Sequence, residues 1–250
     1  MKRFMILAAM FAVCMLSMAQ SEDTYSMQVY LSGGDVQSFL VSEVDSVVFV
    51  ELDGYSSSDD ASDDDTTSSD TTYVNGYAAV DLGLSVKWAT YNVGASSPED
   101  YGNYYAWGET ETKDEYTRGN SVTYYGGEMD DIAGDTEYDA AAANWGSSWR
   151  MPTYEECMEL VDSCTWEWTA LNDVDGFLVT GSTGNSIFLP AVGDRDGTVN
   201  AYEGWFGTYW SSTPYASDTL KAWAINFEMD NIYVGGDSRY RGHAVRPVLE

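Results

Sequence analysis

Apolar and polar residues alternate along much of this chain, and an alternation with a period of two predicts short β-strands. The longest such run lies within residues 80–93, where every second residue from Val80 to Trp88 is apolar. Shorter strand candidates lie at 27–31, 36–41, 46–52, 177–180, 186–189, 209–212, 222–227 and 244–249. Glycine and aspartate, which favour turns, fill many of the gaps. The pattern therefore predicts many short, mainly antiparallel strands.

Two segments carry a helical pattern instead. Residues 137–144 are rich in alanine, and residues 153–161 begin with the features of a helix start. In the second segment Thr153 can cap the first turn, and Glu156 stands three residues later, as a capping box requires. Two helices among short strands place the main domain in the α+β class.

The first nineteen residues have the layout of a cleavable export signal. Lys2 and Arg3 are positively charged, residues 4–16 are apolar, and Ala19 ends a short segment with small residues at the cleavage positions. The apolar run is shorter than the ~20 residues of a membrane span. We expect export by the general secretory route, to the medium or the outer cell surface, without a transmembrane segment. Attachment of a lipid to Cys14 stays open as the alternative.

Composition divides the rest of the chain into three parts. Residues 20–52 hold the first three strand candidates and are expected to form a small β module. Residues 53–72 consist mainly of Ser, Asp and Thr, which bury too little apolar surface to fold, so they predict a disordered acidic linker. Residues 73–250 form the main domain. The 41 acidic and 11 basic residues give a net charge of −30, which excludes nucleic acid as a partner because it repels phosphates.

Two cysteines, Cys157 and Cys164, remain after the export signal. On one continuous helix their Cα atoms would be ~10 Å apart, too far for a disulfide. Two buried thiols are therefore the favoured interpretation. A disulfide stays open if the helix ends between them, because an exported protein meets an oxidising compartment.

Five motifs follow one another through the main domain. They read VDLGLSVKWAT at 80–90, YYAWGE at 104–109, WRMPT at 149–153, YWSS at 209–212 and VRP at 245–247. Together they resemble the Fibrobacter succinogenes major paralogous domain family, over residues 73–250. That family is similar in turn to the C-type lectin-like fold of sulfatase-modifying factors.

The resemblance implies a C-type lectin-like α+β domain in which the first and last strands pair and two helices flank them. It implies a core built around four tryptophans, Trp88, Trp107, Trp149 and Trp210. It also implies that Arg150 and Arg246 are buried ion-pair partners. Folding is therefore the simplest role for the repeated motifs.

Catalytic machinery is not evident in the sequence. The one histidine, His243, has no accompanying Gly-x-Ser-x-Gly elbow, and we interpret it as a surface residue. The cysteine pair of sulfatase-modifying factors has no counterpart after Cys164. Glu109 and Glu111 lie close to Trp107, so a carbohydrate-active enzyme with two carboxylates stays open as an alternative. We expect no catalytic residues and no cofactor.

One segment partly matches a calcium-binding loop. Asp194, Asp196 and Glu203 have the spacing of three EF-hand ligands, and Gly197 follows the second aspartate. Val192 stands at the first ligand position and cannot coordinate a cation. The favoured interpretation is a tight turn, and no metal is expected.

The segment after Trp205 is rich in Tyr, Trp, Asn and Asp, which suit surface recognition. We predict a ligand-binding face formed by eight residues, Tyr215, Asn226, Asp230, Asn231, Tyr233, Asp237, Arg239 and Tyr240. Alternation along strand 222–228 places Trp223 on the core side. The glycine-rich loop 230–242 is expected to expose its polar side chains.

These features predict a secreted or cell-surface recognition protein without catalytic activity. Its partner would be a surface protein or a glycan. An extracellular carbohydrate-active enzyme and a structural surface component without a ligand are the alternatives.

Overall fold

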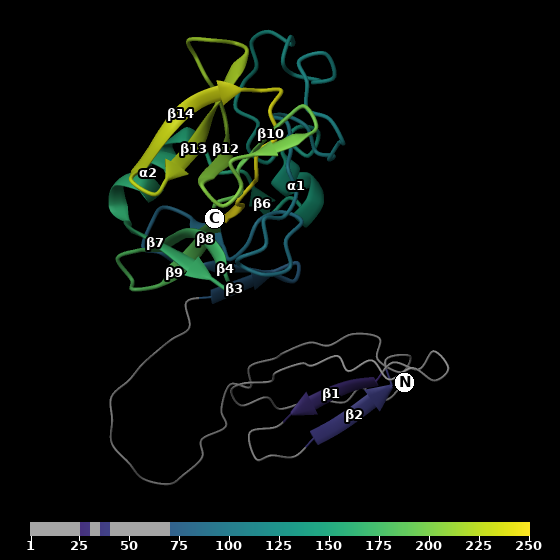
Figure 1. Cartoon of the computed structure of the whole chain (residues 1–250), viewed down its shortest axis with the longest axis vertical. Coiled ribbons are helices and arrows are strands. Elements are labelled where there is room, and N and C mark those ends of the chain that lie inside the picture. The colour runs from purple at the N-terminus through teal and green to yellow at the C-terminus, as the bar shows by residue number, and fades with distance from the viewer. Residues whose placement is uncertain (1–25, 31–35, 41–70) are drawn as a thin grey trace. The chain divides into compact units, whose positions relative to one another are not determined.

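The computed structural model describes residues 26–30, 36–40 and 71–250 (Figure 1). The chain divides into two units, Met1–Thr66 and Thr67–Glu250. In the first unit, β1 (Ser26–Tyr30) and β2 (Val36–Leu40) pair in antiparallel fashion, as the alternation at 27–31 and 36–41 predicted.

Several sequence predictions fall on residues that the structure does not describe. The export signal 1–19, the strand candidate 46–52 and nearly all of the linker 53–72 lie outside the described residues. The last two residues of that linker, Thr71 and Thr72, begin the first strand of the second unit.

The second unit is built from four small sheets and two helices. One sheet has the strand order β3 (Thr71–Val74), β4 (Tyr77–Val80), β5 (Lys87–Ala89), β15 (Val248–Leu249) and β6 (Trp149–Arg150). A second sheet is antiparallel and has three strands, β7 (Thr165–Leu171), β8 (Val174–Thr180) and β9 (Ser186–Pro190). A third, also antiparallel, consists of β12 (Phe206–Pro214), β13 (Lys221–Glu228) and β14 (Asn231–Ser238). A short hairpin consists of β10 (Asp194–Asp196) and β11 (Val199–Ala201), and the helices are α1 (Ala140–Trp145) and α2 (Tyr154–Ser163).

This architecture corrects the predicted α+β class, because the structure is mainly β, with about 40% strand and 9% helix. The expected loop 230–242 contains β14, a strand of eight residues. Its glycines are needed where chains approach closely: a Cβ on Gly236 would lie 2.5 Å from the ring of Tyr215. Glycine inside a strand commonly marks such an approach, and this is why β14 looked like a loop.

The sheet that contains β15 joins distant parts of the domain. Val248 pairs with Trp88 of β5 on one side and with Arg150 of β6 on the other. The resemblance implied that the first and last strands of the domain pair. They share this sheet, but β15 pairs with β5 and β6, and β3 pairs with β4. The run at 80–93 is less regular than predicted, because Asp81 accepts a hydrogen bond from the N–H of Gly83 at 2.7 Å and turns the chain before β5.

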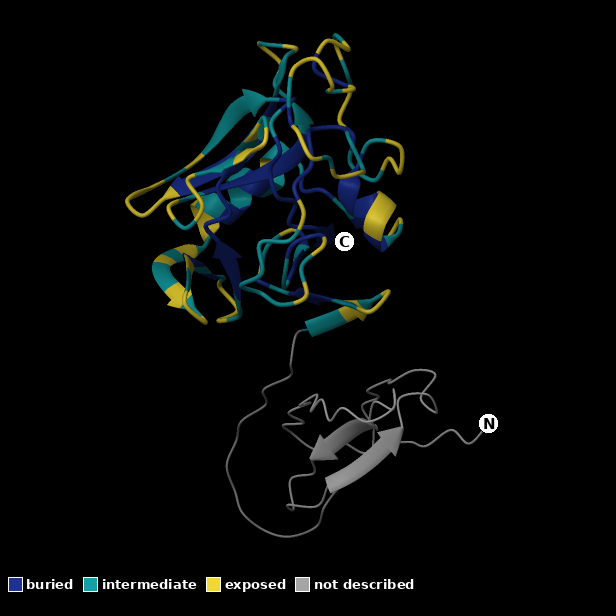
Figure 2. Ribbon diagram, turned by 45° about the vertical axis from the view of Figure 1, so that its right-hand side comes forward, coloured by how far each residue is buried: buried dark blue, intermediate teal, exposed yellow. Residues whose placement is uncertain are grey.

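The sheet β12–β13–β14 has core on both faces. Along β12, Tyr209 packs into one hydrophobic cluster and Trp210 into the other. Along β13, Phe227 joins the first cluster, whereas Ala224 lies in the second. Figure 2 shows the buried residues along these strands and the exposed ones in the loops. The four tryptophans predicted to be core, Trp88, Trp107, Trp149 and Trp210, are all fully buried.

Helix α1 begins at a buried carboxylate. Asp139 is fully buried, and its two oxygens accept hydrogen bonds from the backbone N–H groups of Gly134, Ala141, Ala142 and Met151 at 2.8–3.1 Å. One side chain thus caps the helix and holds two further segments against it. Burial raises the pKa of Asp139 in spite of these four hydrogen bonds.

Helix α2 has the predicted capping box. Thr153 accepts from the N–H of Glu156 at 3.3 Å, and Glu156 accepts from the N–H of Thr153 at 2.8 Å. Glu156 also forms a two-pronged ion pair with Arg150, at 2.7 and 2.8 Å. With six and ten residues, α1 and α2 are too short to cross a membrane, and no other helix is described.

Arg246 is buried as predicted, but it is not an ion-pair partner. Its guanidinium donates to the side-chain oxygen of Asn92 at 2.8 Å and to the carbonyl oxygens of Ala89 and Phe188 at 3.0 and 2.8 Å. No carboxylate of the described residues pairs with it. Burial lowers the pKa of Arg246 to about 10. Neutral oxygen atoms therefore accept the hydrogen bonds of this guanidinium, in place of the carboxylate that the resemblance implied.

The two thiols of the second unit are free. Cys157 is buried and Cys164 is half-buried at the end of α2. The favoured interpretation was two buried thiols: both thiols are free, but only Cys157 is buried.

Candidate functional site

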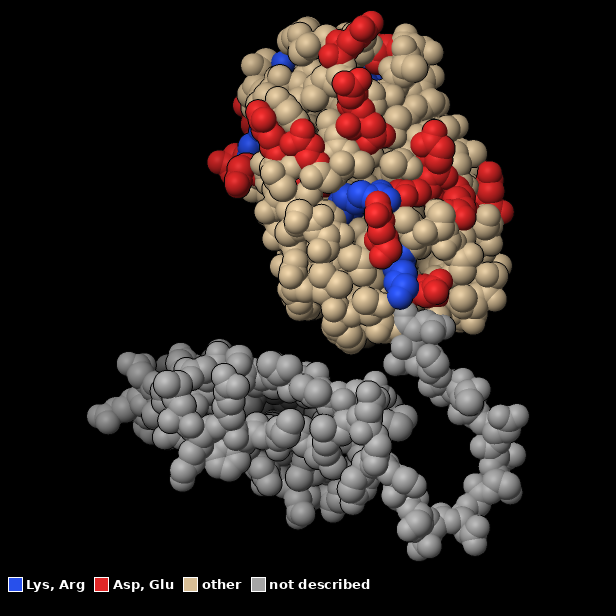
Figure 3. Space-filling view, turned by 180° about the vertical axis from the view of Figure 1, so that it is seen from behind, with Lys and Arg blue, Asp and Glu red and all other residues tan. Residues whose placement is uncertain are grey.

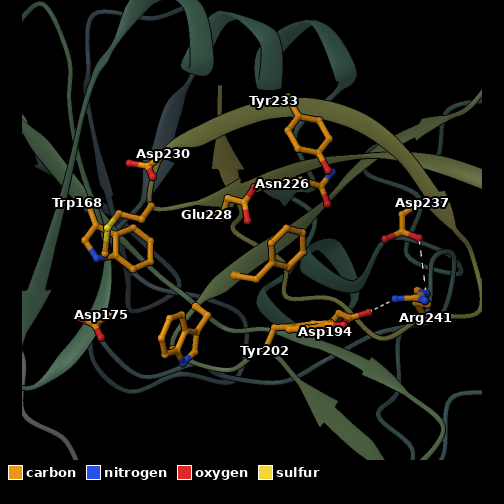
Figure 4. A pocket seen from close by; sticks show the side chains of 14 residues that line it. Trp168, Asp175, Asp194, Tyr202, Asn226, Glu228, Asp230, Tyr233, Asp237 and Arg241 are labelled. Atoms are coloured by element: carbon orange, nitrogen blue, oxygen red, sulfur yellow. Dashed lines mark hydrogen bonds and ion pairs between the residues drawn. The ribbon is translucent and has the colours of Figure 1, made fainter.

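An open pocket of about 920 Å³ lies where strands from three sheets meet. Its wall includes Trp168 of β7, Asp175 of β8 and Asp194 of β10, and the turn between β11 and β12 supplies further aromatic residues. Figure 4 shows the labelled side chains of β13 and β14 on one side and Tyr202 and Asp194 on the other. The volume lies within the range of pockets that hold small molecules or peptide side chains.

Exposed apolar side chains are concentrated in this pocket. Eight large hydrophobic side chains are exposed in the described part of the chain. Four of the eight line the pocket, and they are Tyr202, Trp205, Met229 and Tyr233. Trp205 is 77% exposed and Tyr202 is 69% exposed. Clustered exposed aromatic residues of this kind commonly mark a binding surface.

The turn that carries two of these aromatics is held in an unusual backbone conformation. Tyr202 has a φ of +61°, in the left-handed region, and the N–H groups of Trp205 and Phe206 both donate to its carbonyl oxygen at 3.0 Å. The other non-glycine residues with positive φ in the described part are Asn75, Asn172 and Asp173. Asn and Asp adopt this region readily, whereas a bulky aromatic residue rarely does. The turn thus stores strain that projects Tyr202 towards solvent.

Cross-strand pairing places three of the predicted residues together. Asn226 of β13 lies opposite Tyr233 of β14, so both side chains lie on one face of the sheet and enter the pocket. Asp230, in the turn between these strands, and Asp237, farther along β14, also line it. The structure therefore brings together four of the eight residues predicted from the sequence.

The other four lie elsewhere. Tyr215 and Arg239 line a second, smaller pocket of about 560 Å³, and Asn231 is exposed beyond the β13–β14 turn. Arg239 and Tyr240 are buried, contrary to the expectation that this segment faces water. The guanidinium of Arg239 lies 4.4 Å from the centre of the Trp107 ring and donates to two carbonyl oxygens.

An ion-pair cluster lies at the end of the pocket that Asp237 lines. Arg241 donates to Asp194, and its guanidinium also lies 3.2 Å from a carboxylate oxygen of Asp196 and 3.8 Å from one of Asp237. Figure 4 shows Asp194, Asp237 and Arg241 pointing towards one another. The pKa of Arg241 is raised because the attraction of Asp237 and Asp194 outweighs its burial. This guanidinium is therefore firmly held.

The interpretation of His243 as a surface residue is wrong, because this residue is fully buried. Its ring lies 4.1 Å from the ring of Trp210, and its Nε2 lies 3.2 Å from Oδ2 of Asp237, although not aligned for a good hydrogen bond. Burial would raise the pKa of Asp237, but His243, the N–H of Ser238 and Arg241 outweigh it and lower that pKa. Asp237 is therefore held in its ionised form.

The candidate metal loop is a hairpin turn. Asp194 and Asp196 belong to β10, which pairs with β11, and Gly197 has a φ of +62° in the connection. The turn interpretation is confirmed. In the part of the chain that the structure describes, no group of three or more His, Cys, Asp or Glu residues could hold a metal ion.

The glutamates beside Trp107 have different surroundings. Glu109 pairs with Lys113 at 2.6 Å and accepts a hydrogen bond from the N–H of Val122 at 2.9 Å, so it holds a loop together. Glu111 is exposed. Neither lines the pocket.

Ten of the fourteen residues that line the pocket were not among the binding residues predicted from the sequence. Trp168 and Asp175 come from strands before Trp205, where no binding residue was sought. Tyr202 and Trp205 do have a local signal, because both flank Gly204 in a polar turn, where a large aromatic side chain has no core to fill.

Comparison with protein families gives one match, to the Lcl C-terminal domain over residues 88–249. No curated protein and no solved structure matches the chain. The matched segment runs from β5 to β15 and contains every residue of the pocket. The more specific resemblance to the Fibrobacter succinogenes domain and the C-type lectin-like fold stays a prediction. Because the matched segment is well over half of its length, the chain belongs to the Lcl C-terminal domain family.

Proposed function

We propose that this protein is a non-catalytic recognition protein that acts outside the cell and binds a surface protein or glycan through the pocket. The observation that carries the proposal is the gathering of half of the exposed large apolar side chains in one place. Covering Tyr202 and Trp205 with a partner would remove apolar area from water, which contributes about 25 cal/mol per Å². Aromatic residues in such positions often dominate the binding energy.

The strained turn supports the same proposal. A left-handed φ at a tyrosine costs of order 1 kcal/mol, and a folded protein retains it only where the surroundings enforce it. Tyr202 is largely exposed, so packing of its ring in the core does not explain the conformation. A role in presenting the ring to a partner would explain the conformation.

Export supports the location outside the cell. The charge and apolar pattern of residues 1–19 is that of a secretory signal. The high net negative charge suits a protein that must stay soluble outside the cell.

The alternative function, a carbohydrate-active enzyme, requires a carboxyl group that stays protonated. A glycoside hydrolase needs a carboxylic acid whose pKa is raised, so that it can protonate the leaving group. The pKa of Asp237 is lowered, so this carboxylate does not suit the role of that acid. Its ionised carboxylate can accept hydrogen bonds from a ligand and attract a cationic one.

The test is a screen of the full chain against a glycan array and against surface proteins, followed by two matched variants. Tyr202→Ala removes an aromatic ring from the pocket, and Tyr125→Ala removes an equally exposed ring outside it, since the two are 69% and 70% exposed. We expect Tyr202→Ala, and likewise Trp205→Ala, to weaken binding of the ligand found by about tenfold or more. Tyr125→Ala should leave the affinity unchanged.

Equal affinity of the wild type and both pocket variants, with the fold intact, would place the binding site elsewhere. Turnover of a glycan that is abolished by a single Glu→Gln or Asp→Asn change in the pocket would establish the enzyme alternative.

A further inference from the structure

Some of the charged side chains that line the pocket have a partner of opposite charge, and others do not. The guanidinium of Arg241 already forms ion pairs with Asp194 and Asp237, as described above. The pocket has three further carboxylates, on Asp175, Glu228 and Asp230, and all three are exposed. Their side chains make no ion pair and no hydrogen bond within residues 71–250. The pocket therefore has an unbalanced negative charge at one end.

An indole ring lies at the same end. Asp175 of β8 pairs with Ala170 of β7, so Trp168, two residues away on β7, lies diagonally opposite and on the same face. Glu228 and Asp230 stand on either side of Met229 at the β13–β14 turn. Figure 4 shows Trp168 between Asp175 and Asp230, on the opposite side of the pocket from Arg241.

This combination selects for an organic cation. A neutral ligand that covered the three carboxylates would strip water from them without supplying a counter-charge, which costs free energy. An ammonium or guanidinium group supplies that charge and is also attracted to the face of an indole. The domain already uses such a contact, since the guanidinium of Arg239 lies 4.4 Å from the centre of the Trp107 ring.

Resting on the proposed function, we propose that this end of the pocket binds a lysine or arginine side chain of a partner polypeptide. The methylene groups of such a side chain can lie along Trp168 and Met229 while its charged end reaches the carboxylates. A flexible, exposed methionine is typical of surfaces that bind polypeptides. On the face drawn in Figure 3, acidic side chains are spread widely and basic ones are few, so a basic partner would also be attracted from a distance.

The experiment uses the full chain labelled with methyl-¹³C methionine, in which the Met229 signal is assigned with the variant Met229→Leu. The probes are a blocked pentalysine peptide, the same peptide acetylated on every Nε, and the neutral glycan chitotetraose. We expect pentalysine to shift the Met229 signal and the acetylated peptide to bind at least about tenfold more weakly. Added salt should weaken the binding of pentalysine.

A matched pair of variants separates the pocket from the general negative charge. The double variant Glu228→Gln and Asp230→Asn removes two charges inside the pocket, and Glu111→Gln with Asp162→Asn removes two exposed charges outside it. The first should weaken pentalysine binding by about tenfold and the second by less than about twofold. Equal weakening by both would overturn the proposal.

The proposal also falls if pentalysine at millimolar concentration leaves the Met229 signal unmoved. If chitotetraose or the acetylated peptide moves that signal and binds as tightly as pentalysine, the pocket still recognises a ligand. The proposed function then stands, and only the cationic nature of the ligand is wrong.

Discussion

Asp139 offers the sharpest test of how this domain is held together, because one buried carboxylate serves four backbone N–H groups. The change Asp139→Asn keeps the size of the side chain and replaces one oxygen by an NH₂ group. One oxygen accepts from Ala141 and Ala142, and the other accepts from Gly134 and Met151. In either amide orientation, two buried N–H donors therefore face a donor.

The expected loss follows from these contacts. Each buried donor left without an acceptor costs about 1–3 kcal/mol, so the two cost about 2–6 kcal/mol. Burial raises the pKa of Asp139, which means that the ionised carboxylate itself carries a cost that the neutral amide avoids. We therefore expect a loss near the lower part of this range, about 3 kcal/mol, and a fall in Tm of about 6–12 °C for a domain of this size.

The assay is thermal and urea unfolding of the full chain, followed by circular dichroism and tryptophan fluorescence. The matched control is Asp135→Asn, because Asp135 is exposed and its side chain accepts one local hydrogen bond, from the N–H of Glu137 at 2.9 Å. Its change in stability should stay within about 0.5 kcal/mol. A Tm for Asp139→Asn within about 2 °C of the wild type would refute the account of the four hydrogen bonds.

Three further predictions concern packing, pH and thiol reactivity. Gly181→Ala should lower the Tm by about 4–8 °C in thermal unfolding, because its Cβ would lie 2.0 Å from a backbone carbonyl oxygen, whereas Gly119→Ala, with nothing within 4 Å, should leave it unchanged. The pKa of Glu156 is lowered because its hydrogen bonds outweigh burial, so its stabilising effect is present above its unfolded pKa and is lost as the pH falls through the folded pKa. Urea midpoints of wild type and Glu156→Gln should therefore differ at neutral pH and converge in acid. In the native protein, iodoacetamide should label Cys164 before the fully buried Cys157, as peptide mass spectrometry would show, and a reductant should not change the Tm.

Local sequence patterns predicted the elements that are stabilised by contacts between residues close together in the chain. The capping box of Thr153 and Glu156 acts within one helical turn, and the sequence shows both partners. The hairpin of β8 and β9 likewise joins neighbouring segments around a glycine turn. By contrast, β14 is a strand because its glycines let Tyr215 pack closely, and that contact is invisible in the local pattern.

The candidate site was predictable only in part for the same reason. Asn226 and Tyr233 lie on adjacent strands of one hairpin, so a search of that segment finds both. Trp168 and Asp175 reach the pocket from a separate sheet, and one sequence does not show that the two sheets meet there. His243 looked like a surface residue because its neighbours are polar or small, yet Trp210 covers it.

The position of β15 has a consequence for when the domain can fold. β6 joins its sheet only through β15, and β5 also uses β15 as a partner. During synthesis from the amino end, β5 and β6 emerge long before Val248 and Leu249 exist, so the sheet stays open until almost the whole domain has been made. Pairing of such distant segments is slow, because a long loop must close first. Late completion of this sheet is compatible with the proposed export route, in which a chain crosses the membrane before it has folded fully.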